Sequence, residues 1–228
     1  MQKSEVLAQI RAIGVVPLLR LSSSSDVLDM ADAFHSAHID VVEIPLDMPE
    51  ALSVISTLVE RFDEKVLVGA GSVVDTDSAS TVIAAGASFV TSPSCDLEVV
   101  KYCNATALAV FPGALTPTEI LAAWKAGADM VRVFPCSALG GPSYLKALKA
   151  PLPQIDLFPC GGVTLQNAAA FIEAGACVLG VGRDLVDLAS LREGRLDRIA
   201  ERAHLFTELV RDARGDTPTP PPATVGRR

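Results

Sequence analysis

The stretch that decides the fold of this chain is Gly127-Ala128-Asp129-Met130-Val131-Arg132-Val133-Phe134-Pro135-Cys136. It is a short apolar run, β-branched on both sides of Arg132, that follows an Ala-Gly-Ala turn and is closed by Phe134-Pro135. A run with these boundaries predicts a buried strand. Arg132 carries a permanent cation with five donors and no acceptor. Because burying such a charge alone is costly, Arg132 must be paired, reach solvent at the strand's end or face a polar cavity.

The alternation of an apolar run with a helical period extends over most of the chain. Eight runs predict strands, and three of the predicted helices end in Ala-Gly-Ala, which fits a left-handed helix end that turns into the next strand. A helix over residues 2–12 precedes the first strand, and a final helix is predicted over 191–213. The strands begin near Val15, Asp40, Lys65, Ser88, Thr106, Asp129, Gln154 and Cys177, and the helices between and after them cover 24–37, 49–62, 75–86, 95–104, 116–127, 141–150 and 164–175.

This order of elements predicts the fold class. Strands that alternate with helices indicate a parallel sheet with helices outside it. Eight such units in 228 residues favour a closed barrel over an open doubly wound sheet, and no GxGxxG opens a first helix. We therefore predict an α/β fold, a single (β/α)8 TIM barrel with an N-terminal capping helix over residues 1–213. The proline-rich residues 214–228 are predicted to be a disordered tail.

Composition and charge limit the functions that the chain can have. The hydrophobic fraction of 50% and the mean hydropathy of +0.38 allow a large core, and no apolar run has the length of a membrane span. The net charge of −8 argues against nucleic acid or a membrane surface as a partner. The N-terminal residues do not have the pattern of a signal peptide, and the five cysteines form no CxxC pair. We therefore expect a cytoplasmic protein whose cysteines are reduced thiols and mostly packing residues.

The carboxyl ends of the predicted strands point to a site. In a (β/α)8 barrel these ends meet at one mouth, where the chemistry takes place. Two arginines and a carboxylate there would handle an anion and move protons. Glycine-rich turns after the last two strands would let backbone N–H groups bind a phosphate, although any one of these glycines could simply form a tight turn. The residues brought to the mouth are Arg20, Glu43, Asp47, Gly69-Ala70-Gly71-Ser72, Thr91-Ser92-Pro93, Phe111-Pro112-Gly113, Arg132, Pro159-Cys160-Gly161-Gly162 and Gly180-Val181-Gly182-Arg183.

Several short motifs occur in an order that resembles one enzyme family. They are Val42-Glu43-Ile44-Pro45-Leu46, Val68-Gly69-Ala70-Gly71-Ser72-Val73, Thr116-Pro117-Thr118-Glu119, Val133-Phe134-Pro135, Tyr144-Leu145-Lys146-Ala147-Leu148 and Gly161-Gly162-Val163. Together, over roughly residues 5–210, they resemble the 2-keto-3-deoxy-6-phosphogluconate and 6-phosphogalactonate aldolases. The resemblance implies a homotrimer of (β/α)8 barrels. It also implies cleavage of a phosphorylated keto-deoxy sugar acid to pyruvate and glyceraldehyde 3-phosphate, with no metal and no other cofactor.

One position departs from the family pattern in a way that affects the chemistry. The family's mechanism rests on a lysine in the sixth strand, in the motif V-K-x-F-P, whose amine forms a Schiff base with the substrate ketone. In this chain that position is Arg132. A guanidinium stays protonated and its lone pair is delocalised, so it cannot form the imine. The other lysines match helix or loop positions. We therefore expect a pyruvate enolate that forms without the Schiff-base route.

The remaining site residues are carried over from the resemblance. Glu43 matches the proton-transfer carboxylate and, with Arg132, makes up the predicted catalytic pair. Arg183 stands where a phosphate-binding serine is usual, and Asp47 replaces a residue that is often arginine or asparagine. The carboxylate of Asp47 is expected to repel an anionic substrate. The predicted substrate-binding residues are Arg20, which would hold the substrate carboxylate, Ser72, Pro93, Phe134, Gly161, Gly162, Gly182 and Arg183.

The sequence leaves several readings of this site open. In the first, Arg132 stabilises the enolate as an oxyanion donor does, and Glu43 moves the proton on a 2-keto acid, phosphorylated or not. In the second, Glu43 and Asp47 hold Mg²⁺ or a similar divalent metal in a metal-assisted decarboxylase or aldolase. A third reading is a non-catalytic barrel that binds a keto-acid phosphate or a partner. A fourth is that Arg132 was engineered in place of a natural lysine.

Overall fold

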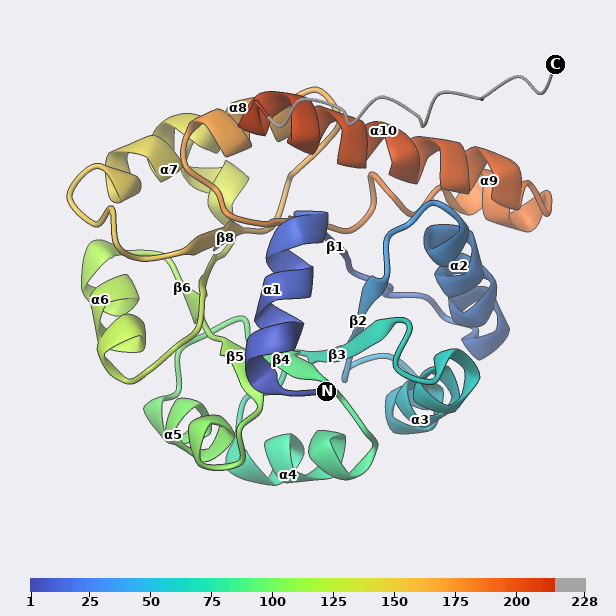
Figure 1. Ribbon diagram of the computed structural model, residues 1–228, viewed down its shortest axis with the longest axis horizontal. Coiled ribbons are helices and arrows are strands. Elements are labelled where there is room, and N and C mark those ends of the chain that lie inside the picture. Colours follow the sequence, from blue (N-terminus) through green and yellow to red (C-terminus); the bar gives the residue numbers. More distant parts are fainter. Residues whose placement is uncertain (216–228) are drawn as a thin grey trace, which may run out of the picture.

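The computed structural model describes residues 1–215, in which short strands and helices alternate around a ring (Figure 1). The prediction of alternating strands and helices is confirmed along this whole length. The strands are β1 (Val15–Pro17), β2 (Val41–Pro45), β3 (Leu67–Gly71), β4 (Phe89–Thr91), β5 (Ala109–Phe111), β6 (Gly113–Ala114), β7 (Val131–Val133), β8 (Leu157–Pro159) and β9 (Leu179–Val181). The helices are α1 (Lys3–Ile13), α2 (Ser24–Ser36), α3 (Ala51–Phe62), α4 (Thr76–Ala84), α5 (Leu97–Ala105), α6 (Pro117–Lys125), α7 (Pro142–Lys149), α8 (Ala168–Glu173), α9 (Leu188–Arg192) and α10 (Leu196–Arg214), with a 3₁₀ turn at Cys136–Leu139.

The strands close into a parallel barrel. β2-β3-β4-β5, β6-β7-β8 and β1-β9 pair in parallel, and β5 and β6 are one strand interrupted at Pro112. Two further contacts join these groups. The Leu19 N–H donates to the Glu43 carbonyl at 2.9 Å next to a Leu18–Glu43 bridge, and Cys160 forms a bridge with Gly180. Eight strand positions therefore close the ring, and the predicted (β/α)8 barrel is confirmed.

The N-terminal helix lies across one end of the barrel, as predicted (Figure 1). The Glu5 carboxylate accepts the backbone N–H of Gln2 at 2.7 Å, and Gly14 ends the helix in the left-handed conformation. Val6 and Ile10 are buried on the barrel side. Because α1 covers this end, substrate must enter from the other one, where the strands' carboxyl ends lie.

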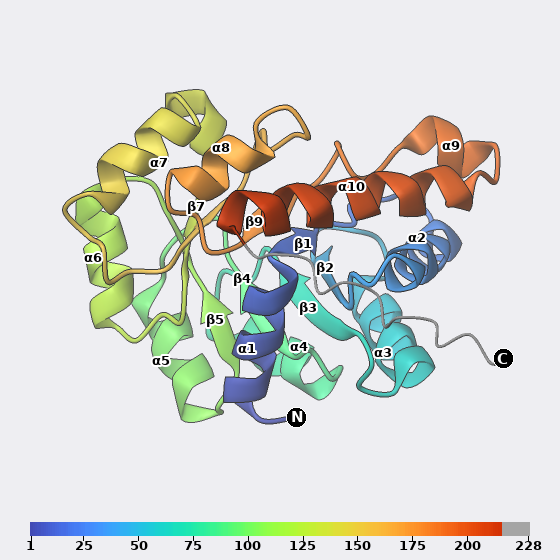
Figure 2. The same ribbon diagram turned by 45° about the horizontal axis from the view of Figure 1, so that its top comes forward.

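The last part of the chain differs from the prediction. The single helix expected over 191–213 is divided into α9 and α10, which are separated by Gly194 at φ +68°. Asp187 caps α9 by accepting the Ala189 N–H at 3.0 Å, a start signal that the periodicity had not revealed. α10 runs along the outside of the barrel against α8 and α2 (Figure 2). It includes Arg214, which was assigned to the tail, and the rest of that predicted tail beyond Gly215 lies outside the described residues.

None of the helices in residues 1–215 is long and apolar enough to cross a membrane. The hydrophobic residues are instead buried between the helices and the strands and inside the barrel.

An apolar layer seals the barrel beneath the site. Phe111 packs against Phe89 and Phe158, with ring centroids 5.5 and 5.9 Å apart, and all three rings are fully buried. Because strand residues two positions apart share a face, the residues after Phe89 and Phe158 that point the same way are Thr91 and Cys160. The phenylalanines therefore support a second layer that is polar. Gly69 leaves the room for this packing, because a Cβ there would lie 2.1 Å from the Phe89 ring.

Substitution of Gly69 tests this layer. We expect Gly69→Ala to destabilise the protein by about 1–3 kcal/mol, because the methyl group would overpack the phenylalanine layer. Urea unfolding followed by circular dichroism measures the change. Gly182→Ala is the matched control, since its Cβ would meet no atom within 4 Å, and it should change stability by less than about 0.5 kcal/mol. Equal effects of the two substitutions would contradict this account.

Candidate active site

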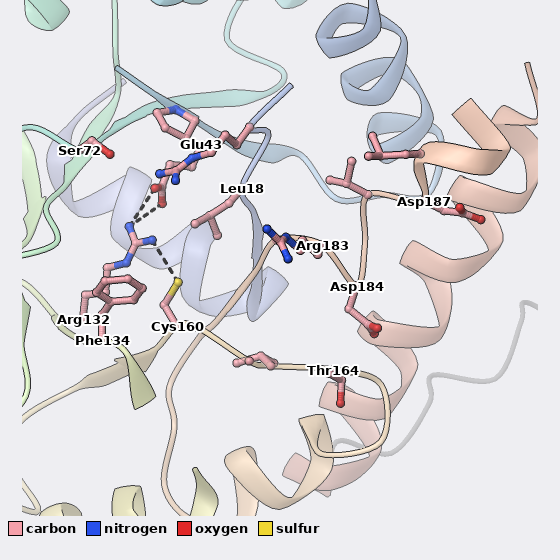
Figure 3. A pocket seen from close by; sticks show the side chains of 18 of the residues that line it. Leu18, Glu43, Ser72, Arg132, Phe134, Cys160, Thr164, Arg183, Asp184 and Asp187 are labelled. Atoms are coloured by element: carbon pink, nitrogen blue, oxygen red, sulfur yellow. Dashed lines mark hydrogen bonds and ion pairs between the residues drawn. The ribbon is translucent and has the colours of Figure 1, made fainter. Parts of the chain in front are cut away.

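A large cavity opens at the carboxyl ends of the strands, with a volume of about 1290 Å³ (Figure 3). This is where the barrel topology places a site. The wall of the cavity includes the strand ends, the turns that follow them, the loop between β9 and α9, and the first residues of α9. All ten of the predicted site residues line it. They are Arg20, Glu43, Ser72, Pro93, Arg132, Phe134, Gly161, Gly162, Gly182 and Arg183.

The floor of the cavity is built around the guanidinium of Arg132, which comes from the middle of β7. Its Nη1 donates to Glu43 Oε1 at 2.8 Å and to Oε2 at 3.1 Å, and also to the hydroxyl of Thr91. Its Nη2 donates to Cys160 Sγ at 3.0 Å (Figure 3). The partners come from β2, from the end of β4 and from just after β8. The positive charge of Arg132 is therefore paired with Glu43 across the barrel interior, which is one of the arrangements that the sequence predicted.

The surroundings of Arg132 keep it charged. Its side chain is 8% exposed and that of Glu43 is 1% exposed. Burial by itself would lower the pKa of Arg132, but the charge of Glu43 and the hydrogen bonds to Glu43 and Cys160 raise it above its ordinary range. The rings of Phe134 and Phe158 also lie 5.9 Å from the guanidinium carbon. Arg132 is therefore a fixed cation that cannot give up its proton.

Glu43 is held in place by the strand next to it. In the register of β2 and β3, Pro45 lies beside Gly71, and a Cβ on Gly71 would be 2.3 Å from Glu43 Oε1. The glycine in the motif Gly69-Ala70-Gly71-Ser72 thus leaves the space in which the carboxylate meets Arg132. The motif then ends at Ser72, a non-glycine residue with φ +61° on the cavity wall.

Two residues of the floor were not singled out from the sequence. Thr91 and Cys160 were expected at the mouth, but neither was given a role. The signal that identifies them is the strand alternation, because each follows a buried phenylalanine by two residues and so shares its inward face. Cys160 had instead been counted among the packing thiols.

At the rim, Arg20 forms an ion pair that alters one expectation. Its Nη2 lies 3.3 Å from Asp47 Oδ1, and both side chains are more than half exposed. The carboxylate of Asp47, expected to repel an anion, is therefore balanced by Arg20. An exposed pair of this kind is worth less than about 1 kcal/mol, so an incoming carboxylate can replace Asp47 on Arg20.

The far end of the cavity is formed by the loops after β8 and β9. Gly161 and Gly162 have φ of +85° and +84°, and Arg183 is exposed on the opposite wall. The carboxylate of Asp184 joins the two loops to α10, because it accepts the Leu165 N–H at 2.9 Å and lies 2.8 Å from Arg202 Nη2. Neither Asp184 nor Arg202 had been predicted.

The two carboxylates of the magnesium alternative do not share a site in this arrangement. Glu43 is buried against Arg132, whereas Asp47 is exposed beside Arg20. Within residues 1–215 no three His, Cys, Asp or Glu side chains are grouped so that they could hold a metal ion. The metal-assisted reading stays a prediction.

Comparison with known proteins places these observations in a family. The model of the KDPG and KHG aldolase family matches residues 6–202. The 2-dehydro-3-deoxy-6-phosphogalactonate aldolase of Escherichia coli (strain K12) is 35% identical over 201 residues, which are 87% of this chain and 95% of that protein.

Solved structures agree with this result. The KDPG aldolase of Legionella pneumophila, with pyruvate captured as a covalent carbinolamine intermediate, has a TM-score of 0.79 at 26% identity, covering 90% of this chain and 97% of its own. A cube-shaped protein cage designed by fusing symmetric oligomeric domains has a TM-score of 0.81 at 33% identity, covering 89% of this chain and 74% of its own.

The buried ion pair makes a testable contribution to stability. We expect Glu43→Gln to destabilise the protein by about 3–5 kcal/mol, because it leaves the Arg132 charge buried without a counter-charge. In the double variant Glu43→Gln, Arg132→Met much of that loss should be recovered, so a double-mutant cycle in urea should give a coupling energy well above about 1 kcal/mol.

The exposed pair of Arg11 and Asp156, whose Nη2 and Oδ2 atoms are 2.9 Å apart, is the matched control. The same cycle on it, with Arg11→Met and Asp156→Asn, should give less than about 1 kcal/mol. Additive effects of the Glu43 and Arg132 substitutions would show that the two charges are not coupled.

Proposed function

We propose a reaction for this chain, which belongs to the family of KDPG and KHG aldolases, a family of carbon-carbon lyases. The protein cleaves a 2-keto-3-deoxy sugar acid, phosphorylated at its far end, to pyruvate and an aldehyde. The cleavage passes through a pyruvate enolate and uses no Schiff base. The observation that carries the proposal is the pairing of Glu43 with the buried, permanently charged Arg132 on the cavity floor.

The absence of a Schiff base follows from the amines that the cavity offers. A carbinolamine such as the one in the Legionella pneumophila enzyme forms by attack of an amine on the keto group. In this chain Arg132 occupies the floor, and no lysine lines the cavity within residues 1–215. A guanidinium does not attack ketones, because its nitrogen lone pairs are delocalised. The electrons released by C–C cleavage must therefore be held as an oxyanion.

Arg132 is suited to hold that oxyanion. A fixed cation in a cavity that largely excludes water stabilises developing negative charge strongly, and its position needs no reorganisation during the reaction. Thr91 and Cys160 fix the guanidinium from two sides, so its orientation does not depend on the ligand. Removing an oxyanion donor of this kind typically costs a factor of about 10²–10³ in rate.

Glu43 is the proton-transfer group. In cleavage it takes the proton from the C4 hydroxyl and later returns it to C3 of the enolate. A keto oxygen bound to the guanidinium would place C3 and C4 near the carboxylate, because Arg132 Nη1 and Glu43 Oε1 are 2.8 Å apart. Both Glu43 oxygens also accept hydrogen bonds from Arg132 Nη1, at 2.8 and 3.1 Å, which orients the carboxylate beside the guanidinium.

The two ends of the substrate are assigned to the two ends of the cavity. The substrate carboxylate binds Arg20, with the Ser72 hydroxyl nearby on the same wall. The phosphate binds Arg183 and the backbone of Gly161 and Gly162, which adopt left-handed φ values. Arg183 has no ion pair within residues 1–215, whereas the cavity's other arginines each have one, so Arg183 is the cation that a phosphate can neutralise.

A second candidate is a barrel that binds such an acid without turning it over. One observation favours it: both oxygens of Glu43 accept hydrogen bonds from Arg132 Nη1, so the carboxylate is already paired with a fixed cation. The two candidates differ in whether Glu43 abstracts a proton from bound pyruvate.

We also propose that the protein is a cytoplasmic homotrimer without a resident metal. Exposed large apolar side chains such as Leu52, Val74 and Leu97 offer surface for contact between subunits. Sedimentation equilibrium should give three times the chain mass of 23.9 kDa. A monomer mass at micromolar concentration would contradict the trimer.

Exchange of the methyl protons of pyruvate into D2O, followed by NMR, tests the proposed chemistry. We expect the wild-type protein to exchange them, and Glu43→Gln to lower the rate by about 10²–10⁴-fold while pyruvate binding persists. Addition of EDTA should leave the rate unchanged, and a loss of exchange would instead support the metal-assisted reading. Binding without exchange at any pH would favour the non-catalytic barrel.

Reduction with borohydride in the presence of pyruvate tests the absence of an imine. The wild-type protein should gain no covalent adduct in intact-mass spectrometry, because none of the cavity-lining residues in the described part of the chain is a lysine. Arg132→Lys restores an amine on the floor and should give one reduced adduct per chain at residue 132. An adduct on a lysine of the wild-type protein would show that the reaction uses an imine after all.

A further inference from the structure

Among the five cysteines, Cys160 has a hydrogen-bonding position that the packing thiols lack. The thiols of Cys136 and Cys177 donate to backbone carbonyls, at 3.7 Å to Gly141 O and 3.2 Å to Leu157 O. Cys160 accepts a hydrogen bond from Arg132 Nη2 at 3.0 Å, but its own S–H has no acceptor in residues 1–215. It is also the one cysteine that lines the cavity.

The backbone fixes Cys160 at this place. Its N–H donates to Val133 O and its carbonyl accepts the Cys136 N–H, both at 3.0 Å, which ties it to the strand that carries Arg132. On the other side Gly180 leaves room for the sulfur, because a Cβ there would lie 3.1 Å from Cys160 Sγ. The sulfur thus lies on the cavity floor with Glu43 on the other side of the same guanidinium (Figure 3).

Arg132 can hold an enolate oxygen by charge and hydrogen bonding, but it cannot protonate that oxygen. An enolate held by a guanidinium remains an anion, because the pKa of Arg132 is raised above its ordinary range. Burial raises the pKa of the Cys160 thiol above its ordinary range, although Arg132 opposes this effect. The Cys160 side chain is therefore a neutral thiol at neutral pH. It can donate its proton to an oxygen anion, whereas Arg132 can only attract the negative charge.

We propose that Cys160 is a further catalytic residue, whose S–H donates to the keto oxygen of the bound 2-keto acid and transfers its proton as the enol forms. This inference rests on the proposed function, because it names the donor for a second proton transfer in the same reaction.

The protons and electrons balance through the cycle. Glu43 takes the proton of the C4 hydroxyl, and the O–H electron pair forms the C=O bond of the departing aldehyde. The C3–C4 bond breaks, and its electron pair becomes the C2–C3 double bond of the enol. The π electrons of the ketone form the O–H bond with the proton from Sγ, which leaves Cys160 as a thiolate. Glu43 then protonates C3, and the enol O–H proton returns to the thiolate. The hydroxyl proton has moved to C3, and both side chains are restored.

This transfer keeps the charge of the floor constant. Before the step the negative charge lies on Glu43, bonded to Nη1 of Arg132, and after it the charge lies on Cys160, bonded to Nη2. The same cation is the partner of both anions, at 2.8 and 3.0 Å. The buried site therefore never holds an unpaired anion, which would be costly in this environment.

Cysteine variants measured in the pyruvate exchange assay test the proposal. The assay uses the same two groups, with Glu43 taking a methyl proton in place of the hydroxyl proton. We expect Cys160→Ala to lower the exchange rate by about 10²–10⁴-fold. Cys160→Ser should fall between the alanine variant and wild type, since a hydroxyl donates a hydrogen bond but is a weaker acid. Cys136→Ala, a buried thiol outside the cavity, should exchange at the wild-type rate.

The pH profile separates a proton donor from a structural thiol. Exchange by wild type should fall at high pH as Cys160 loses its proton, and this basic limb should be absent in Cys160→Ser. The ionisable groups that face Cys160 are Arg132, Glu43 and Cys136. Burial raises the pKa of Cys136 to about 11, so the basic limb must persist in Cys136→Ala to be assigned to Cys160.

The outcomes distinguish this proposal from the proposed function. Wild-type exchange that survives in Cys160→Ala with an unchanged pH profile would overturn the role of Cys160 and leave the enolate chemistry in place. Absence of exchange in wild type would overturn both.

Discussion

The arrangement of this barrel depends on one constraint: a permanent cation inside a hydrophobic ring of strands must be balanced there. Arg132 meets it through Glu43, Thr91 and Cys160, which come from three other strand positions. The contacts with Glu43 and Cys160 each require a small neighbour, and Gly71 and Gly180 provide the space. Below this polar layer the phenylalanines exclude water, which strengthens every interaction above them. The glycines of the strands thus make room for the ion pair of Arg132 and Glu43, and the aromatic residues pack beneath the same pair.

The same constraint underlies the electron sink that we propose for this barrel of the aldolase family. A lysine on the floor would store electrons in a covalent imine, whereas a guanidinium can only attract them. The second solution requires precise placement of the cation, because electrostatic stabilisation depends on the direction in which the donors point. The hydrogen bonds that Arg132 donates to Glu43, Thr91 and Cys160 supply that placement. In the proposed reaction, the arginines of the rim then remain for the two ends of the ligand.

The sequence predicted most of the fold and the positions of the site residues, but not their connections. Strand β7 was evident from its β-branched run, and the need for a partner to Arg132 followed from its charge. That the partner is Glu43, 89 residues away, depends on barrel closure and register, which periodicity does not encode. Cys160 was read as a packing thiol because cysteines usually are. The break at Gly194 was missed because one glycine lowers helix propensity by only about 1 kcal/mol, and the cap at Asp187 decides where α9 begins.

The contacts of the Asp184 carboxylate distinguish two parts of the cavity, the far wall and the floor, which can change separately. Through it, the loops after β8 and β9 and the distant helix α10 form one wall, which is anchored outside the barrel. The floor, by contrast, is anchored only to strands. Substitutions in the wall can therefore reshape the far end of the cavity without disturbing the charges on the floor. A lineage with this architecture can vary the shape of its cavity while the charged floor stays the same.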